Sequence, residues 1–283
     1  MSIFRTAGVG LLVIAFAEGG LSAAPVLSPD QAQVLEAARQ FALGYGDRLP
    51  NFICTQITSR NSIGQKISVT VDSRGRAPTI FQQPPVLGGS DRIVERLTYF
   101  NQVENYEVVS IDGKPAPGAD HLQLTGAISA GEFGTALRDI FDRASGTKFD
   151  WHGTANLHGR SAYVYAFSVP RETGIEVRDA KRDADVLVGY AGFVFVDPDT
   201  QEVLRMTSTL DLPRGLSITD AERSVDYEPV IIADKKYTLP VRSEVILENE
   251  DFRYVNRIEF KDYRKFGAES TIHYDDPAPS GTP

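Results

Sequence analysis

The sequence predicts an α+β protein with a mostly antiparallel β-sheet and amphipathic helices laid on its concave face. Residues 186–266 alternate between apolar and polar side chains in runs joined by short turns, which is typical of neighbouring antiparallel strands. Two other segments place apolar residues at helical spacing, and each such stripe needs a surface to cover. The order of helix, strands, helix and strands indicates one domain rather than two.

Residues 1–24 have the features of a secretory signal peptide. Arg5 precedes an apolar run from Val9 to Ala17, and small residues follow, with cleavage expected after Ala23 or Ala24. The run is much shorter than the roughly 20 residues that span a bilayer, and no later segment approaches that length. We therefore expect an exported protein, periplasmic or extracellular, without a transmembrane segment after signal cleavage.

The mature chain is acidic and long enough to bury a core of its own. Residues 25–274 are expected to form a single α+β domain, and residues 275–283 a disordered tail. The formal net charge is -9 and no basic stripe offsets it, so the surface repels phosphate backbones. Nucleic acid is therefore not expected as a partner.

Two helices are predicted from their start signals. The first begins at Ser28-Pro29-Asp30, which combines a capping serine with proline in the first turn, and it ends at Gly44. The second is predicted from the segment between Ser129 and Glu132, which matches the S-x-x-E capping box. One side of this second helix would carry Phe133, Leu137, Ile140 and Phe141.

Strand patterns fill most of the remaining chain. The pair Asp112-Gly113 is typical of a tight hairpin turn, and Asp197-Pro198-Asp199 is a turn within the long series. The segment Arg171–Asp185 is dense in both charge signs and poor in apolar residues, so we expect a solvated excursion from the sheet. The expected strands lie within residues 66–72, 91–100, 106–114, 148–153, 161–170, 186–197, 202–212, 223–232, 237–248 and 252–266.

No strong catalytic signature is found in the sequence. Cys54, the only cysteine, alternates with Phe52 in a strand pattern and is expected to be a buried thiol. Ser145 to Lys148 fit the S-x-x-K nucleophile pattern, but neither S-D-N nor K-T-G follows, and we interpret the segment as a turn. We predict no catalytic residues and no cofactor.

No metal site is predicted either. The histidines do not have the spacing of a zinc site, and we interpret them as surface or loop residues. Asp197 and Asp199 lack the further spaced carboxylates of a calcium loop and are interpreted as turn residues. The four histidines are His121, His152, His158 and His273.

Large apolar side chains provide candidate ligand-binding positions. The second predicted helix and two predicted strands each carry such side chains on one face. They either fill an ordinary core or, if helix and sheet are held apart, line an apolar cavity of the kind that binds hydrophobic ligands. The sequence is compatible with both alternatives. The cavity candidates are Phe133, Leu137, Phe141, Phe149, Trp151, Tyr163, Tyr165 and Phe167.

The second half of the chain resembles the lipoprotein carrier superfamily, which includes the outer-membrane lipoprotein carriers (LolA-LolB-like) and RseB-like periplasmic sensors. The likeness covers residues 187–267, with a strand pair around an Asp-Pro turn in "GFVFVDPDTQEVLRM", a hairpin running into Leu239-Pro240, and the final strand "NRIEFKDYRKFG". The whole mature chain, with "LPNFICTQ" and "SAGEFGTALRDIF", further resembles other exported bacterial proteins. The resemblance implies a curved half-barrel sheet closed by helices over an apolar cavity, which holds acyl chains in the lipoprotein carriers.

We therefore expect a non-enzymatic exported protein that binds an apolar ligand (a lipid or acyl group) or an envelope protein partner in a half-barrel cavity. Two other classes fit the sequence. One is an envelope hydrolase with an unidentified active site, which a strongly shifted pKa in a cleft would mark. The other is a sensor or interaction module with a filled core, which an exposed apolar patch would mark.

Overall fold

The computed structural model describes residues 27–64, 67–70, 79–82, 86–121, 131–179 and 182–267, with the backbone alone at 67–70, 79–82 and 86–88. The expected signal peptide at 1–24 and the expected tail at 275–283 lie outside these residues, as do Ser129 and His273. No helix in the described part of the chain is long and apolar enough to cross a membrane.

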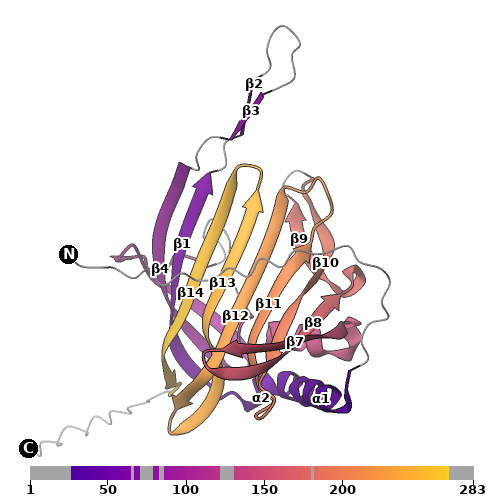
Figure 1. Ribbon diagram of the computed structural model, residues 1–283. Helices are drawn as coiled ribbons and strands as arrows, with labels where there is room; N and C mark the ends of the chain where they lie inside the picture. The colour runs from indigo at the N-terminus through magenta and orange to yellow at the C-terminus, as the bar shows by residue number, and fades with distance from the viewer. Residues whose placement is uncertain are drawn as a thin grey trace, which may run out of the picture.

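A curved, open sheet of twelve strands forms most of the molecule (Figure 1). The strands of the protein are β1 (Phe52–Gly64), β2 (Ile67–Thr70), β3 (Thr79–Gln82), β4 (Val86–Phe100), β5 (Val103–Ile111), β6 (Lys114–Pro115), β7 (Lys148–Leu157), β8 (Arg160–Val169), β9 (Ile175–Asp179), β10 (Ala184–Val196), β11 (Val203–Asp211), β12 (Ile218–Ile232), β13 (Lys235–Asn249) and β14 (Phe252–Lys265). Across the large sheet they lie in the order β6-β5-β4-β1-β14-β13-β12-β11-β10-β8-β7, with β9 paired to β10, while β2 and β3 form a separate hairpin. All of these pairs are antiparallel, which confirms the predicted α+β class with its mostly antiparallel sheet.

The described residues form three α-helices, α1 (Pro29–Leu43), α2 (Tyr45–Arg48) and α3 (Thr135–Phe141). α1 begins as predicted, because Ser28 and Gln31 cap each other: each side chain accepts a hydrogen bond from the other residue's backbone N–H. α1 contacts α3, β10 and β11, and it lies at the lower end of the sheet in Figure 1. The Tyr165 hydroxyl of β8 donates to the Gln31 carbonyl at 2.7 Å and ties α1 to this end.

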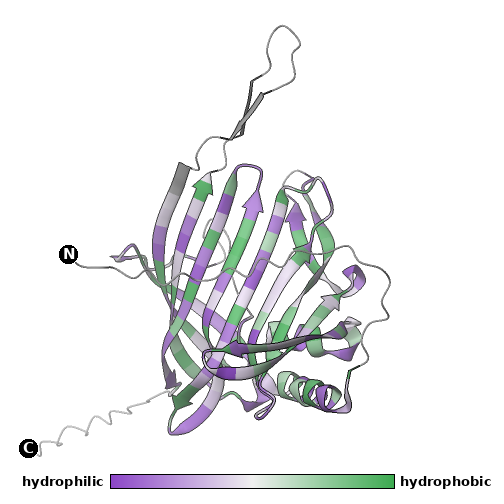
Figure 2. Cartoon of the chain, viewed as in Figure 1, coloured by the Kyte–Doolittle hydropathy of each residue, from purple (hydrophilic) through white to green (hydrophobic). Residues whose placement is uncertain are grey.

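The apolar core lies on the concave face of the sheet, which we name the inner face, where α1 and α3 cover it. Hydrophobic and hydrophilic residues alternate along the strands (Figure 2), because successive side chains point to opposite faces. One core cluster joins α1 and α3 to β8, β10, β11 and β12, and a second surrounds Phe52, Cys54 and Phe133. Cys54 is buried as predicted, and this burial raises the pKa of its thiol.

The predicted capping box of the second helix is wrong. α3 begins only after Gly134, and this N-cap residue makes no side-chain cap hydrogen bond. The Glu132 carboxylate is instead buried, with Oε1 3.2 Å from Nη2 of Arg223 on β12. Gly134 turns the chain with a φ of 125°, and a Cβ at this position would lie 2.9 Å from the Tyr45 ring. This turn places Phe133 in the second core cluster ahead of the helix.

The segment Arg171–Asp185 is mostly exposed, as its charge pattern predicts, but part of it forms a strand of the sheet. Within it, β9 pairs with the first half of β10, and Val177 and Asp179 are buried. The Asp179 carboxylate accepts a hydrogen bond from the backbone N–H of Ser217 at 3.0 Å. The charge density did not predict this strand, because its exposed side chains alternate with the buried Val177 and Asp179.

Candidate functional site

The inner face continues beyond the part that the helices cover. Strand register aligns side chains into rows that run across the strands. The row of Val194, Met206 and Val225 lies in the core with α1 and α3. Residues two positions further along each strand point to the same face, because side chains alternate. The next two rows are Gly192, Ser208, Arg223 and Val245, followed by Tyr190, Leu210, Ala221 and Leu247.

A half-open pocket of about 310 Å³ lies over these two rows, between the sheet, α3 and β9. We name it the apolar pocket. α3 contributes Thr135, Ala136 and Asp139, which lie on the side of the helix opposite its buried residues. The walls are mostly aliphatic and comprise Ile175, Met206, Leu210, Ala221, Val245, Ile246 and Leu247.

Few polar groups border the apolar pocket, and partial burial sets their ionisation. The guanidinium of Arg223 is paired with Glu132 at 3.2 Å. Partial desolvation raises the pKa of Asp139 and also that of Glu222. Partial burial raises the pKa of Tyr190 to about 12, so its hydroxyl stays protonated at neutral pH. Mostly aliphatic walls with a minority of polar groups suit an apolar ligand.

Seven of the eight cavity candidates lie together in the packed core beside α1. Phe141 stacks on Phe149 with ring centroids 5.1 Å apart, and Phe149 lies 6.3 Å from Phe167. Trp151 meets the Tyr163 ring edge-on at 5.1 Å. The group consists of Leu137, Phe141, Phe149, Trp151, Tyr163, Tyr165 and Phe167.

Phe133 lies apart from this group, in the second cluster, where its ring contacts Phe52 and Phe260. The eight candidates are not among the residues that line the apolar pocket. Sequence reasoning missed the lining residues because they are small or aliphatic side chains within ordinary strand patterns. The sequence feature that could have indicated them is the alternation of apolar and polar residues along β12 and β13. This alternation continues well beyond the length that α3 can cover.

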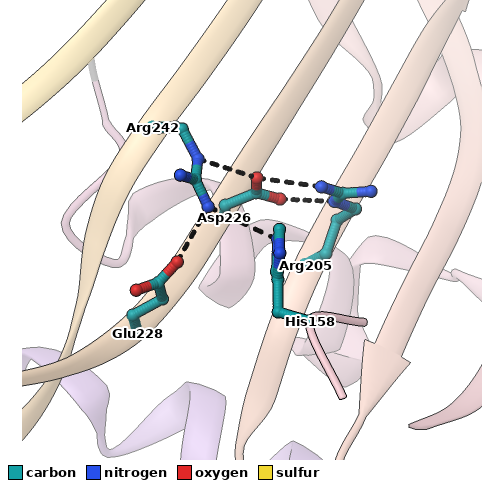
Figure 3. A network of polar contacts seen from close by, with 5 residues as sticks. All are labelled: His158, Arg205, Asp226, Glu228 and Arg242. Atoms are coloured by element: carbon teal, nitrogen blue, oxygen red, sulfur yellow. Dashed lines mark hydrogen bonds and ion pairs between the residues drawn. The ribbon is translucent and has the colours of Figure 1, made fainter. Parts of the chain in front are cut away.

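A larger pocket, of about 790 Å³, lies on the outer face beside the tip of the β7–β8 hairpin. Its polar residues bind one another (Figure 3). Asp226 accepts from Arg205 at 2.9 Å and from Arg242 at 3.5 Å, and Arg242 also donates to Glu228 at 2.8 Å. Nε2 of His158, in the hairpin turn, lies 3.4 Å from Arg242. These contacts hold the hairpin against β12 and β13, so we interpret this pocket as a structural contact between strands and not as a ligand site.

His121 is buried, which corrects the expectation of a surface or loop histidine. Its Nδ1 lies 2.7 Å from Oε1 of Glu95, and its ring stacks on Tyr106 with centroids 4.2 Å apart. Gln56 donates to the other oxygen of Glu95 at 2.9 Å, so the group links β1 and β4 to the segment after β6. Among the residues that the structure describes, no three His, Cys, Asp or Glu side chains are placed to hold a metal ion.

Solved structures match this chain over most of its length, at low similarity. A DUF1329 family protein from Desulfovibrio piger is 12% identical, with a TM-score of 0.35, over 83% of this chain and 95% of its own. An LolA superfamily protein from Nitrosomonas europaea is 9% identical, with a TM-score of 0.30, over 84% and 94%. A domain from Vibrio parahaemolyticus, described as an outer membrane lipoprotein-sorting protein, is 10% identical, with a TM-score of 0.34, over 84% and 94%.

One of these matches is thus described as a member of the LolA superfamily, which residues 187–267 resemble in sequence. No protein-family model matches the chain, and no curated protein matches it.

Proposed function

We propose that this chain is an exported, non-enzymatic protein that binds an apolar ligand, a lipid or acyl group, in the apolar pocket of the inner face. The observation that supports the proposal is the pocket itself, about 310 Å³ between α3 and side chains such as Met206, Leu210 and Leu247. Ligand pockets start at about 300 Å³, so the space suits one acyl chain segment. Its burial would contribute roughly 0.8 kcal/mol per methylene group.

The proposal also assigns roles to the rest of the chain. Residues 1–24 direct export to the periplasm or the exterior, and residues 25–274 act as one domain. The seven cavity candidates in the first core cluster hold α3 and the β7–β8 hairpin in place, since Phe141, Phe149 and Phe167 pack in series. In this role they keep the wall of the apolar pocket rigid without touching the ligand.

A substitution that fills the apolar pocket tests the proposal. Ala221 faces the pocket from β12, and Ser224 lies on the opposite face of the same strand. We expect Ala221→Trp to weaken binding of a fluorescent polyene fatty acid by at least about tenfold. Displacing two methylene groups loses about 1.6 kcal/mol of binding free energy, and about 1.4 kcal/mol corresponds to a factor of ten. Ser224→Trp is the matched control and should bind as the wild type does.

The measurement is a fluorescence titration, with thermal melts to show that both variants are folded. Equal binding by Ala221→Trp and the wild type would place the ligand elsewhere. A wild-type protein that binds no acyl probe would refute the proposal and favour a partner on the surface.

A further inference from the structure

The apolar pocket meets a second pocket on the inner face, which we name the polar pocket. The polar pocket has a volume of about 280 Å³ and is lined by β1, β4 and β14. The apolar pocket ends on β13 at Val245 and Leu247, and the polar pocket begins on β14 at Asn256 and Tyr254. β13 and β14 are neighbours, and their register pairs Val245 with Asn256 and Leu247 with Tyr254. The two pockets are therefore consecutive parts of one groove that crosses the strands.

The rows of the inner face change character between these two strands. On the polar side, Asn256 pairs in register with Arg60 of β1, and Arg60 pairs with Asp91 of β4. In the next row, Tyr254 pairs with Ser62. The second row is thus mainly aliphatic as far as β13, with Leu210, Ala221 and Leu247, while the first row also carries Ser208 and the paired Arg223. From β14 onward both rows carry polar groups.

The charges in the polar pocket cancel each other. Nε of Arg60 donates to Oδ1 of Asp91 at 2.7 Å, and a second bond joins Nη2 to Oδ2. This bidentate hydrogen bonding is the main reason that the pKa of Arg60 is raised. A ligand anion would therefore meet a guanidinium that is already neutralised, while the amide and hydroxyl groups around it are uncharged.

The apolar pocket offers no compensating positive charge. Arg223 is paired with Glu132, and Asp139 and Glu222 add two further carboxylates at its edge. A negative headgroup anywhere along the groove would therefore be repelled or left without a counter-ion. An uncharged headgroup would keep its hydrogen bonds without this cost.

We propose that the groove binds a single-chain amphiphile whose headgroup is uncharged and rich in hydroxyl groups, with the tail in the apolar pocket and the headgroup against Arg60, Asp91 and Asn256. The inference rests on the proposed function, since the tail occupies the same apolar pocket. β12 and β1 are separated by three strand spacings, about 14 Å at the usual spacing of neighbouring strands. A medium-length chain spans this distance, and either a glycerol or a sugar supplies such a headgroup.

The test is a calorimetric titration of the full chain with three ligands of equal tail length: decyl glucoside, monodecanoylglycerol and decanoate. The wild type should bind at least one of the two neutral ligands about tenfold more tightly than decanoate at neutral pH, since two retained hydrogen bonds account for a factor of that size. The ligand that is favoured identifies a sugar or a glycerol as the headgroup.

Ser62→Leu removes a hydroxyl from the polar pocket and narrows it, and Ser59→Leu is the control on the opposite face of β1. Ser62→Leu should weaken binding of the favoured neutral ligand by about tenfold and binding of decanoate by less than about twofold. Ser59→Leu should change neither affinity. Asp91→Asn is an independent test, because it removes the carboxylate charge that neutralises Arg60 and should shift the preference toward decanoate.

Two outcomes separate this inference from the proposed function. If decanoate binds as tightly as the neutral ligands and Ser62→Leu weakens all three equally, the headgroup assignment is wrong and the apolar ligand site stands. If none of the three ligands binds, or Ala221→Trp leaves them all unaffected, the proposed function fails and the inference fails with it.

Discussion

Replacing Phe141 by alanine should destabilise the protein by about 3–5 kcal/mol. Phe141 is fully buried at the end of α3, where its ring stacks on Phe149 at 5.1 Å and the Arg39 guanidinium lies 5.9 Å from its centroid. Truncation removes the transfer free energy of the ring and leaves a cavity between α1, α3 and β7. The lost aromatic stack accounts for about 0.5–1.5 kcal/mol of this cost.

Urea denaturation followed by circular dichroism measures this cost as a shift of the midpoint at constant m. Phe252→Ala is the matched control, since Phe252 is 37% exposed on β14. This substitution should lower the free energy of unfolding by less than about 1 kcal/mol. A loss below about 1 kcal/mol for Phe141→Ala as well would show that α3 does not pack on the sheet as described.

Two further predictions concern backbone conformation and burial. Gly134→Ala should destabilise the protein by about 1 kcal/mol more than Gly118→Ala. Both glycines have a positive φ, but only a Cβ at Gly134 would contact the Tyr45 ring. Equal shifts of the urea midpoint for the two variants would contradict this close contact. The Cys54 thiol should react with a thiol reagent far more slowly in the native protein than in urea, because it is buried and its pKa is raised. Labelling of the native protein at the denatured rate would show that the second core cluster is open.

Local signals in the sequence predicted structure well where the partners are also local. Ser28 starts α1 because its partner, Gln31, lies within the first turn of the same helix. Glu132 has the same spacing from Ser129, yet its carboxylate pairs with Arg223 on a distant strand. The capping pattern could not predict this competition, since it depends on which strand passes beneath the helix.

The candidate site was harder to predict for a related reason. Alternation along β11 shows that Ser208 and Leu210 share a face of the sheet, but it does not show whether a helix covers them. The pairing of β1 with β14 joins segments from the two ends of the domain, and no short turn in the sequence indicates it. The groove depends on that pairing, because it places Arg60 and Ser62 beside Asn256 and Tyr254.

The groove follows from a mismatch in length between the helix and the strands. α3 has seven residues and is about 10 Å long, whereas β12 and β13 have fifteen residues each and extend for about 50 Å. α3 therefore covers only a fraction of the inner face, and the turn at Gly134 determines where this helix begins. Where α3 does not reach, Leu210 and Leu247 keep the inner face apolar. We therefore expect a shorter α3 to enlarge the apolar pocket and a longer α3 to close it, because Thr135, Ala136 and Asp139 form the wall opposite the strands.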